Sequence, residues 1–453
     1  MLSKKFKLRK VLKFIKIYLI KRRLMLVSRR VIKIFTLLLI LGLFNLQGSY
    51  VFGKVKIEYL SHTTDINELK LYRELGKMFT SKNPDIEVEV TSVPERFYEQ
   101  LQIRIASGMS PDATFLANWH IPPFVERGAL TCLDPFVEKE RYNLAKFFPN
   151  TVEACKVGGK LYGLPRHPSP MVLYYNKDLF DKAGISYPND NWTWEKDFLE
   201  AAKKLTKTDD KGKYIQWGAY ISRDISHVLL PIIYCLGGRI LDEDMKKCVI
   251  DTPQSITAIQ WLGDLWVKHK VAITPDLAAG LAGDPFVLGK VAMVPQIYPF
   301  IITQAQFIKD FKWDVVILPK GKGGRWNRAA VGVHAIPAGA KHPEEAWKWL
   351  KFLATEEAQL KIAESGLVMP SLRVLASSPK FLQPAKGPQI NRKAFVDGMT
   401  KSKLVKEIFH PKWSEMETQV IAPEFDLVFL GKKSAEEACK KIAIECNRIL
   451  GVK

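Results

Sequence analysis

The sequence predicts an α/β fold arranged in two lobes. Short runs rich in Val and Ile alternate with stretches that have helical apolar spacing, a pattern typical of parallel strands joined by helices. The chain has 453 residues, enough to bury about two or three hydrophobic cores. Helical periodicity dominates the later part, and we find no internal repeat or long low-complexity linker.

The alternation of strands and helices begins directly after residue 53. In chain order we expect a strand over Val55 to Leu60, a helix over Ile66 to Thr80, a strand over Ile86 to Thr91, a helix over Glu95 to Ala106 and a strand over Ala113 to Leu116. Pro84 ends the first helix. Because helices join consecutive strands, these strands are expected to run parallel.

Further elements follow by the same criteria of periodicity and length. Helices are predicted over Trp194 to Leu205, Pro253 to Lys268, Pro343 to Leu353, Glu356 to Glu364, Pro411 to Leu430 and Ser434 to Leu450. Strands are predicted over Met171 to Tyr175, Val291 to Val294, Trp313 to Ile317 and Ala330 to Ile336. The basic, glycine-rich stretch Lys320 to Arg325 lacks the spacing of a phosphate-binding loop and is expected to be a surface loop.

Residues 1–53 are interpreted as an export signal rather than as part of the fold. Their basic part leads into the apolar run Ile34 to Phe44, which has the length of a signal-peptide core and is too short to span a membrane comfortably. Val51 and Gly53 suit the small-residue positions before a cleavage site, so cleavage is expected after Gly53. Met25 begins a complete signal peptide by itself, so we expect Met1 to Leu24 to be an upstream extension or a mis-assigned start. No lipobox Cys follows, so a periplasmic protein is expected.

The charge and the cysteines exclude other classes of protein. The net charge is +21, but 13 of the 68 basic residues and none of the 47 acidic residues lie in residues 1–53. The remaining chain is mildly basic and lacks a nucleic-acid-binding motif, so no nucleic-acid partner is expected. Cys132–Cys155 and Cys235–Cys248 are candidate disulfides, with buried free thiols as an equal alternative. No cysteine spacing suits zinc, and we expect neither a metal nor a cofactor.

Short motifs occur along the chain in a specific order. They are Asn83-Pro84-Asp85-Ile86-Glu87-Val88, Ala106-Ser-Gly-x-x-Pro-Asp112, Gly159 to Pro165 (GKLYGLP), Leu173 to Ile185 (LYYNKDLFDKAGI), Trp192-Thr-Trp-Glu195, Phe286-x-x-Gly-Lys-Val-Ala-Met293, Ala340 to Leu353 and Gly431 to Ala438. Several of these motifs are too degenerate to identify a family when taken one at a time. In this joint order the chain resembles family 1 of the bacterial extracellular solute-binding proteins, the ligand-capturing components of carbohydrate ABC importers, to which maltose-binding protein is distantly related.

The resemblance implies a type II periplasmic-binding-protein fold, in which two or three hinge crossings join two α/β lobes that close on a ligand. We expect lobe 1 to comprise residues 54–165 with about 319–375, and lobe 2 residues 166–318 with about 376–453. It also implies capture without catalysis, a mono- or oligosaccharide ligand, ABC permease transmembrane subunits as partners, and a monomer.

The chain departs from the family pattern at two strand ends. Relatives often have Trp at the end of the first strand, where this chain has Leu60-Ser61-His62. The family's Ala-Met-x-x-x-Gly-x-Trp segment is here Ala292 to Pro299, in which Tyr298 is an aromatic substitute one position away. These departures leave the ligand subtype open.

A sugar presents apolar C–H faces and a rim of hydroxyls, so its site combines aromatic rings with planar polar groups. We selected such residues from strand ends, crossings and the start of the late helix: Asn118, Trp119, His120, His62, Asp65, Arg166, His167, Gln296, Tyr298, Trp326 and Trp413. For some of them a structural role is the alternative. Trp119 and Trp326 can serve packing, Asp65 can cap the following helix, and Arg166 can form an internal salt bridge.

Two other functions were weighed. A secreted carbohydrate-active enzyme would need a pair of carboxylates in the cleft. Asp65, Asp224 and Glu424 are available, but no spacing identifies a pair, and GxSxG, HExxH and P-loop motifs are absent from the sequence. A binding protein for a non-sugar, such as a glycerol phosphodiester or a peptide, stays open because Arg166 and Arg223 suit a phosphate.

Overall fold

The computed structural model describes residues 13–22, 54–63, 65–303, 305–328, 330–385 and 387–452. The chain divides into a first unit, Met1–Lys54, and a second compact unit, Val55–Lys453. In the first unit residues 13–22 are helical, while the predicted signal-peptide core and cleavage site lie outside the described residues. No helix within the described ranges is long and apolar enough to cross a membrane.

The first lobe is built on a five-stranded mixed sheet. Its order is β2 (Ile86–Ser92), β1 (Val55–Ser61), β3 (Ala113–Ala117), β13 (Val331–Ala335) and β6 (Leu164–Pro168). The three N-terminal strands run parallel, as predicted, and β13 is antiparallel to both β3 and β6. Parallel strands bring their carboxyl ends to one edge of the sheet, which is where binding sites of α/β proteins form.

The second lobe is built on another five-stranded mixed sheet. Its order is β11 (Trp313–Ile317), β7 (Met171–Asn176), β10 (Val291–Ile297), β9 (Tyr214–Ala219) and β8 (Lys207–Thr208). Successive residues of β7 point to opposite faces. Leu173 and Tyr175 belong to one buried cluster, and Val172 and Tyr174 belong to another. The sheet is therefore covered on both faces at β7, which explains the nearly continuous apolar runs of β7 and β10.

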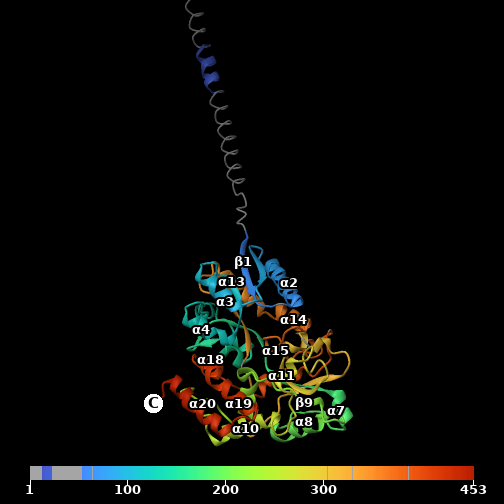
Figure 1. Cartoon of the computed structure of the whole chain (residues 1–453). Coiled ribbons are helices and arrows are strands. Elements are labelled where there is room, and N and C mark those ends of the chain that lie inside the picture. Colours follow the sequence, from blue (N-terminus) through green and yellow to red (C-terminus); the bar gives the residue numbers. More distant parts are fainter. Residues whose placement is uncertain are drawn as a thin grey trace, which may run out of the picture. The chain divides into compact units, whose positions relative to one another are not determined.

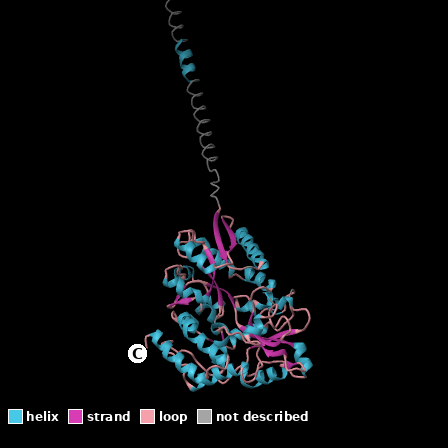
Figure 2. Cartoon of the chain, viewed as in Figure 1, coloured by secondary structure: helices cyan, strands magenta, loops and turns pink. Residues whose placement is uncertain are grey.

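Helices flank the strands of each sheet (Figure 2). In the first lobe they are α2 (Ile66–Lys82), α3 (Phe97–Ala106), α4 (Ile121–Glu126), α5 (Asp134–Glu140), α6 (Pro149–Glu153), α13 (Pro343–Leu353) and α14 (Glu356–Ser365). In the second they include α7 (Lys177–Ala183), α8 (Leu199–Leu205), α9 (Leu230–Cys235), α10 (Pro253–Trp266), α17 (Lys393–Thr400), α18 (Trp413–Met416), α19 (Ala422–Phe429) and α20 (Ala435–Leu450). Figure 1 shows α10, α19 and α20 lying together, with α2, α3 and α13 grouped around β1.

The chain passes between the two sheets at several points. It leaves the first sheet after Pro168 and enters the second at Met171. It returns between β11 and β13, a stretch that contains the two-residue strand β12 (Trp326–Asn327), and β12 pairs with β14 (Lys403–Leu404). A further passage lies between α14 and α17, since α17 packs against β7 and β11. These crossings place the cleft between the lobes.

All six cysteines are free thiols in the structure. Neither candidate disulfide is formed, which agrees with the alternative of free thiols; five of the six are buried and Cys132 is partly exposed. Cys235 Sγ instead accepts a hydrogen bond from Trp326 N at 3.2 Å, and Cys132 Sγ donates to Asp134 at 3.5 Å.

Candidate functional site

A cavity of about 490 Å³ lies in the cleft between the lobes, and we call it the cleft cavity. Both lobes and the crossings contribute to its wall, which consists of His62, Thr63, Asp65, Glu68, Tyr98, Phe115, Ala117, Trp119, Arg166, His167, Ser169, Ile297, Pro299, Arg328, Ala330, Val331, Gly332 and Val368. His62 follows β1 and Trp119 follows β3. These strands are parallel neighbours, so their carboxyl ends deliver both side chains to the same place.

A buried ion pair lines the cleft cavity. Arg166 in β6 is 1% exposed and bonds the carboxylate of Glu68 in α2. Thr63 Oγ1 donates to the same carboxylate at 2.6 Å. Burial opposes ionisation of Glu68, but Arg166 and Thr63 outweigh it and lower the Glu68 pKa to about 2. The salt-bridge alternative for Arg166 is therefore what the structure shows, and the pair still faces the cavity.

Two neutral histidines line the cavity beside this pair. His62 stacks on Phe115 with ring centroids 4.0 Å apart. Burial and the charge of Arg166 lower the pKa of His62 to about 4 and that of His167 to about 3. Both rings are uncharged at neutral pH, and a neutral imidazole can donate at one nitrogen and accept at the other. His62 Nδ1 is buried and has no hydrogen-bond partner, so it is available to a ligand hydroxyl.

Asp65 caps a helix and also lines the cavity. Its Oδ1 accepts from the backbone N–H groups of Asn67 and Glu68, both at 2.8 Å. This is the N-cap geometry that satisfies the first donors of a helix. The capping alternative is thus correct for one oxygen of Asp65, and the other can face a ligand.

Arg328 lies on the crossing between β12 and β13 and reaches the same cavity. Its side chain is buried, with the guanidinium carbon 5.8 Å from the centre of the Trp119 ring. Burial lowers its pKa to about 10, which keeps it protonated at neutral pH. Nε of Arg328 has no hydrogen-bond partner.

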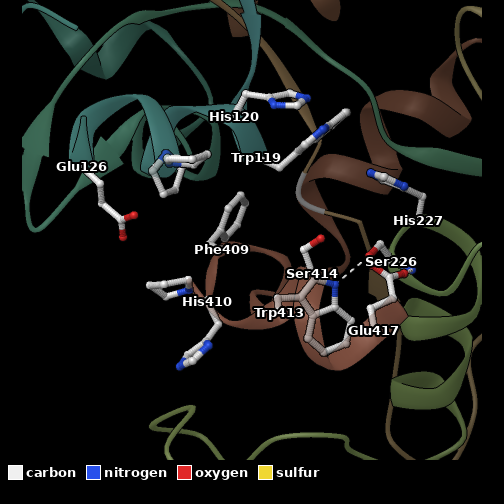
Figure 3. A pocket seen from close by; sticks show the side chains of 13 residues that line it. Trp119, His120, Glu126, Ser226, His227, Phe409, His410, Trp413, Ser414 and Glu417 are labelled. Carbon is white, nitrogen blue, oxygen red and sulfur yellow. Dashed lines mark hydrogen bonds between the residues drawn. The ribbon is translucent and has the colours of Figure 1, made fainter. Parts of the chain in front are cut away.

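A second cavity of about 360 Å³ lies beside the first, and we call it the side cavity. Trp119 is shared by the two walls, and the side cavity is further lined by His120, Pro122, Pro123, Glu126, Ser226, His227, Phe409, His410, Pro411, Trp413, Ser414 and Glu417. Figure 3 shows Trp119 and His120 on one side of it, opposite Trp413 and Ser414.

Hydrogen bonds and ring contacts fix the aromatic walls of the side cavity. Trp413 Nε1 donates to Ser226 Oγ at 2.7 Å, and this hydroxyl donates to Glu417 at 2.8 Å. His120 stacks on Tyr98 at 3.4 Å between centroids, and burial lowers the His120 pKa to about 4. Such rings are pre-positioned, so a ligand need not order them on binding.

The structure brings together seven of the eleven predicted residues and leaves four outside both cavities. His62, Asp65, Trp119, Arg166 and His167 line the cleft cavity, and Trp119, His120 and Trp413 line the side cavity. The four outside are Asn118, Gln296, Tyr298 and Trp326.

Each of those four side chains has a structural contact instead. Asn118 is buried and accepts from Val331 N at 3.0 Å. Gln296 lies in β10, and its Oε1 accepts from the next backbone N–H at 3.4 Å. The Tyr298 hydroxyl donates to Gly366 O at 2.8 Å within the core. Trp326 packs edge-on against Tyr234, with centroids 4.7 Å apart.

The sequence analysis did not select three residues that line the cleft cavity: Glu68, Arg328 and Phe115. Glu68 was absent from the predicted site because it lies inside a helix, although its i+3 position after Asp65 places it at the same helix end. Arg328 follows Trp326-Asn327, so the crossing was recognised, but Trp326 was selected from it and Arg328 was not. Phe115 is one of five buried residues in β3, and nothing in that apolar run distinguishes it.

The arrangement favours reversible capture. Aromatic rings, neutral imidazoles, a carboxylate and guanidinium groups can cover an apolar face and bond the polar rim of a small molecule. Within the described part of the chain, no group of three or more His, Cys, Asp or Glu side chains could hold a metal ion.

Comparison with known proteins agrees with this architecture. A putative binding protein of Brucella abortus (strain 2308) is 25% identical over 417 residues, which cover 90% of this chain and 96% of that protein. The arabinooligosaccharide-binding protein of Bacillus subtilis (strain 168) is 26% identical over 308 residues, covering 65% and 68%. A solved ABC substrate-binding protein of Listeria monocytogenes in complex with cycloalternan is 28% identical with a TM-score of 0.75, covering 88% of this chain and 100% of that one.

The expected two-lobe, type II periplasmic-binding-protein fold is confirmed by this structural likeness. The family model described as bacterial extracellular solute-binding protein matches residues 63–360. That match begins just after β1, covers the other strands of both sheets and ends within α14. The chain therefore belongs to the family of bacterial extracellular solute-binding proteins.

Proposed function

We propose that this protein captures a mono- or oligosaccharide in the cleft cavity and delivers it to the membrane permease of an ABC transporter. One observation carries the proposal: a cavity between two lobes combines the ring of Trp119 with a set of fixed polar groups. A sugar needs both, because its C–H faces prefer an aromatic surface and its desolvated hydroxyls need hydrogen-bond partners.

The polar groups can bond sugar hydroxyls that donate a hydrogen bond and sugar hydroxyls that accept one. His62 and His167 offer neutral nitrogens, and Asp65 offers a carboxylate oxygen. The Glu68–Arg166 pair holds its own charges in place, so it orients the wall without demanding a charged ligand. These groups stand on strand ends and a helix start, so little ordering accompanies binding.

Delivery requires a change of state that the ligand drives. Each lobe supplies part of the cavity wall, so a ligand contacts more atoms when the lobes approach each other. It therefore binds the closed state more tightly and shifts the population toward it. The permease would then distinguish the loaded protein from the empty one by its closed shape.

Similar proteins support a carbohydrate as the ligand class. The Bacillus subtilis relative is named for arabinooligosaccharide binding, and the Listeria protein was solved with cycloalternan. The side cavity adjoins the cleft cavity at Trp119, which offers room for a second sugar ring. This continuity favours an oligosaccharide over a monosaccharide.

The remaining parts of the proposal follow from this role. The protein would be exported by a cleavable signal peptide, act in the periplasm as a monomer and lack catalytic activity. Lobe 1 would comprise residues 54–165 with about 319–375, and lobe 2 residues 166–318 with about 376–453. The candidate ligand contacts are the seven predicted residues that line the two cavities.

A thermal-shift screen of the chain from Lys54 onward tests the proposal. Binding to the native state raises the melting temperature, by an amount that grows with ligand concentration. We expect mono- or oligosaccharides to raise it, and glycerol phosphodiesters and peptides to leave it unchanged. A shift with a phosphodiester or peptide and none with any sugar would overturn the carbohydrate assignment. Turnover of a glycan without stable binding would indicate an enzyme.

A further inference from the structure

The guanidinium of Arg328 is an uncompensated charge in the wall of the cleft cavity. The residue is 7% exposed, and its Nε lacks a hydrogen-bond partner. No salt bridge involving Arg328 is present among the described residues. A buried cation without a counter-ion is costly to the folded protein, so its retention at this position calls for a physical explanation.

The other charged or titratable side chains of the same wall are paired, held by backbone groups or neutral. Arg166 and Glu68 neutralise each other. Asp65 is engaged with two backbone N–H groups at the start of α2. His62 and His167 are neutral because burial and Arg166 lower their pKa values. Arg328 is therefore the charge among the described wall residues that still lacks a partner.

Asp224 is the carboxylate whose field reaches Arg328, but it is occupied elsewhere. It caps the segment Ile225–Leu229, accepting from His227 N at 2.9 Å and contacting His227 Nδ1 at 3.1 Å. Asp224 weakens the effect of burial on the Arg328 pKa without forming an ion pair with it. An anionic partner for Arg328 must then come from outside the chain or from a rearrangement that brings Asp224 closer.

We infer that the captured sugar carries a carboxylate, as a uronic acid does, and that this group pairs with Arg328 while the sugar ring contacts Trp119. The inference rests on the proposed function and names the substrate class of the same site. A guanidinium matches a carboxylate with two parallel hydrogen bonds. Its position 5.8 Å from the centre of the Trp119 ring lets one acidic sugar engage both groups.

A carboxylate fits this wall better than a phosphate group does. Phosphate sites combine cations with the free N–H groups of a helix start. Here the helix start that faces the cavity belongs to α2, and the Asp65 carboxylate already occupies it with the same sign of charge. That carboxylate would repel a phosphate placed at the helix end, whereas a uronate at Arg328 can keep away from it.

Calorimetric titration with matched disaccharides tests the inference. Digalacturonate is compared with α-1,4-galactobiose, from which it differs by two carboxylates in place of hydroxymethyl groups. Cellobiuronate is compared with cellobiose, from which it differs by one. Glycerophosphoglycerol is the phosphodiester probe. The variants are Arg328→Gln, Arg328→Lys, which keeps the charge, and Asp224→Asn. Arg73→Gln on the exposed face of α2 is the matched control.

We expect at least one acidic disaccharide to bind roughly 10- to 100-fold more tightly than its neutral counterpart. Arg328→Gln should abolish that preference, Arg328→Lys should keep part of it, and Arg73→Gln and Asp224→Asn should leave it in place. Ligand-free Arg328→Gln should melt at the same or a higher temperature, because it loses an unpaired buried charge. Misfolding of this variant would therefore count against the inference.

Equal binding of acidic and neutral disaccharides would overturn the inference and leave the proposed function standing. The same holds for a preference that survives in Arg328→Gln or disappears in Asp224→Asn. Binding of glycerophosphoglycerol without either acidic sugar would overturn the inference and favour the phosphodiester. Failure of every mono- and oligosaccharide in the thermal-shift screen would overturn the proposed function as well.

Discussion

Trp119 is the residue whose removal should most weaken ligand binding with least harm to the fold. Its ring lines both cavities and is half-buried. It contacts the His227 ring edge-on at 4.7 Å between centroids, with Arg328 on another side. Trp119→Ala removes the apolar surface on which a sugar would stack. By analogy with interface hot spots, the loss is about 1–3 kcal/mol of binding free energy, or about 5- to 150-fold in Kd.

Isothermal titration with the sugar that gives the largest thermal shift measures this effect. Trp217→Ala is the matched control, because Trp217 is also half-buried but stacks on Tyr214 in the second lobe, outside both cavities. We expect the control to bind like the unmodified protein. A Trp119→Ala variant that melts normally and binds with unchanged Kd would refute the stacking argument.

Other predictions concern stability around the cleft. Glu68→Gln leaves Arg166 as a buried charge without its counter-ion, so chemical denaturation should show a loss of about 3 kcal/mol; an unchanged free energy of unfolding would contradict this. Gly332→Ala would place a methyl group 2.3 Å from Cε1 of His167, so it should lower the melting temperature and weaken binding, whereas a neutral effect would mean that the ring moves freely. Lowering the pH from 7 to 5 should lower the melting temperature, since four largely buried histidines take up protons near pH 6.5 when unfolded but not when folded, at about 1.4 kcal/mol per pH unit for each proton. Glu407 opposes this effect, because burial raises its pKa to about 7 and it gains a proton in the folded state over the same pH range. More groups act in the destabilising direction than in the stabilising one. A flat or rising melting temperature would therefore contradict the reasoning. The four histidines are His62, His120, His167 and His334, whose pKa values burial lowers furthest.

Helices and strands with clear apolar periodicity and clear signals at their ends could be predicted from the sequence. The helix predicted over Pro343 to Leu353 has those bounds, because Pro begins it and a strong apolar face supports it. The strand β6 was missed, since Leu164–Pro168 contains two prolines. Its position at the edge of the sheet, where it pairs with β13 alone, tolerates their missing donors.

The candidate site was predictable where it depends on strand direction. Trp119 and His62 follow parallel strands, so the rule about carboxyl ends located both. The rule identifies which residues lie at the carboxyl end of a strand, but it does not say which way each side chain points. Asn118 and Trp119 are neighbours, yet one bonds a buried backbone group and the other faces the cavities. The Glu68–Arg166 pair joins residues 98 positions apart, a contact that only the folded chain brings together.

A crystal structure of the protein with its tightest-binding sugar tests the central claim most directly. The account predicts a sugar ring in the cleft cavity against Trp119, with its polar groups bonded to His62, His167 or Arg328. The lobes should lie closer together than in the ligand-free crystal. A sugar bound outside the cleft, or one in the cleft without contact to Trp119 and these polar groups, would contradict the account.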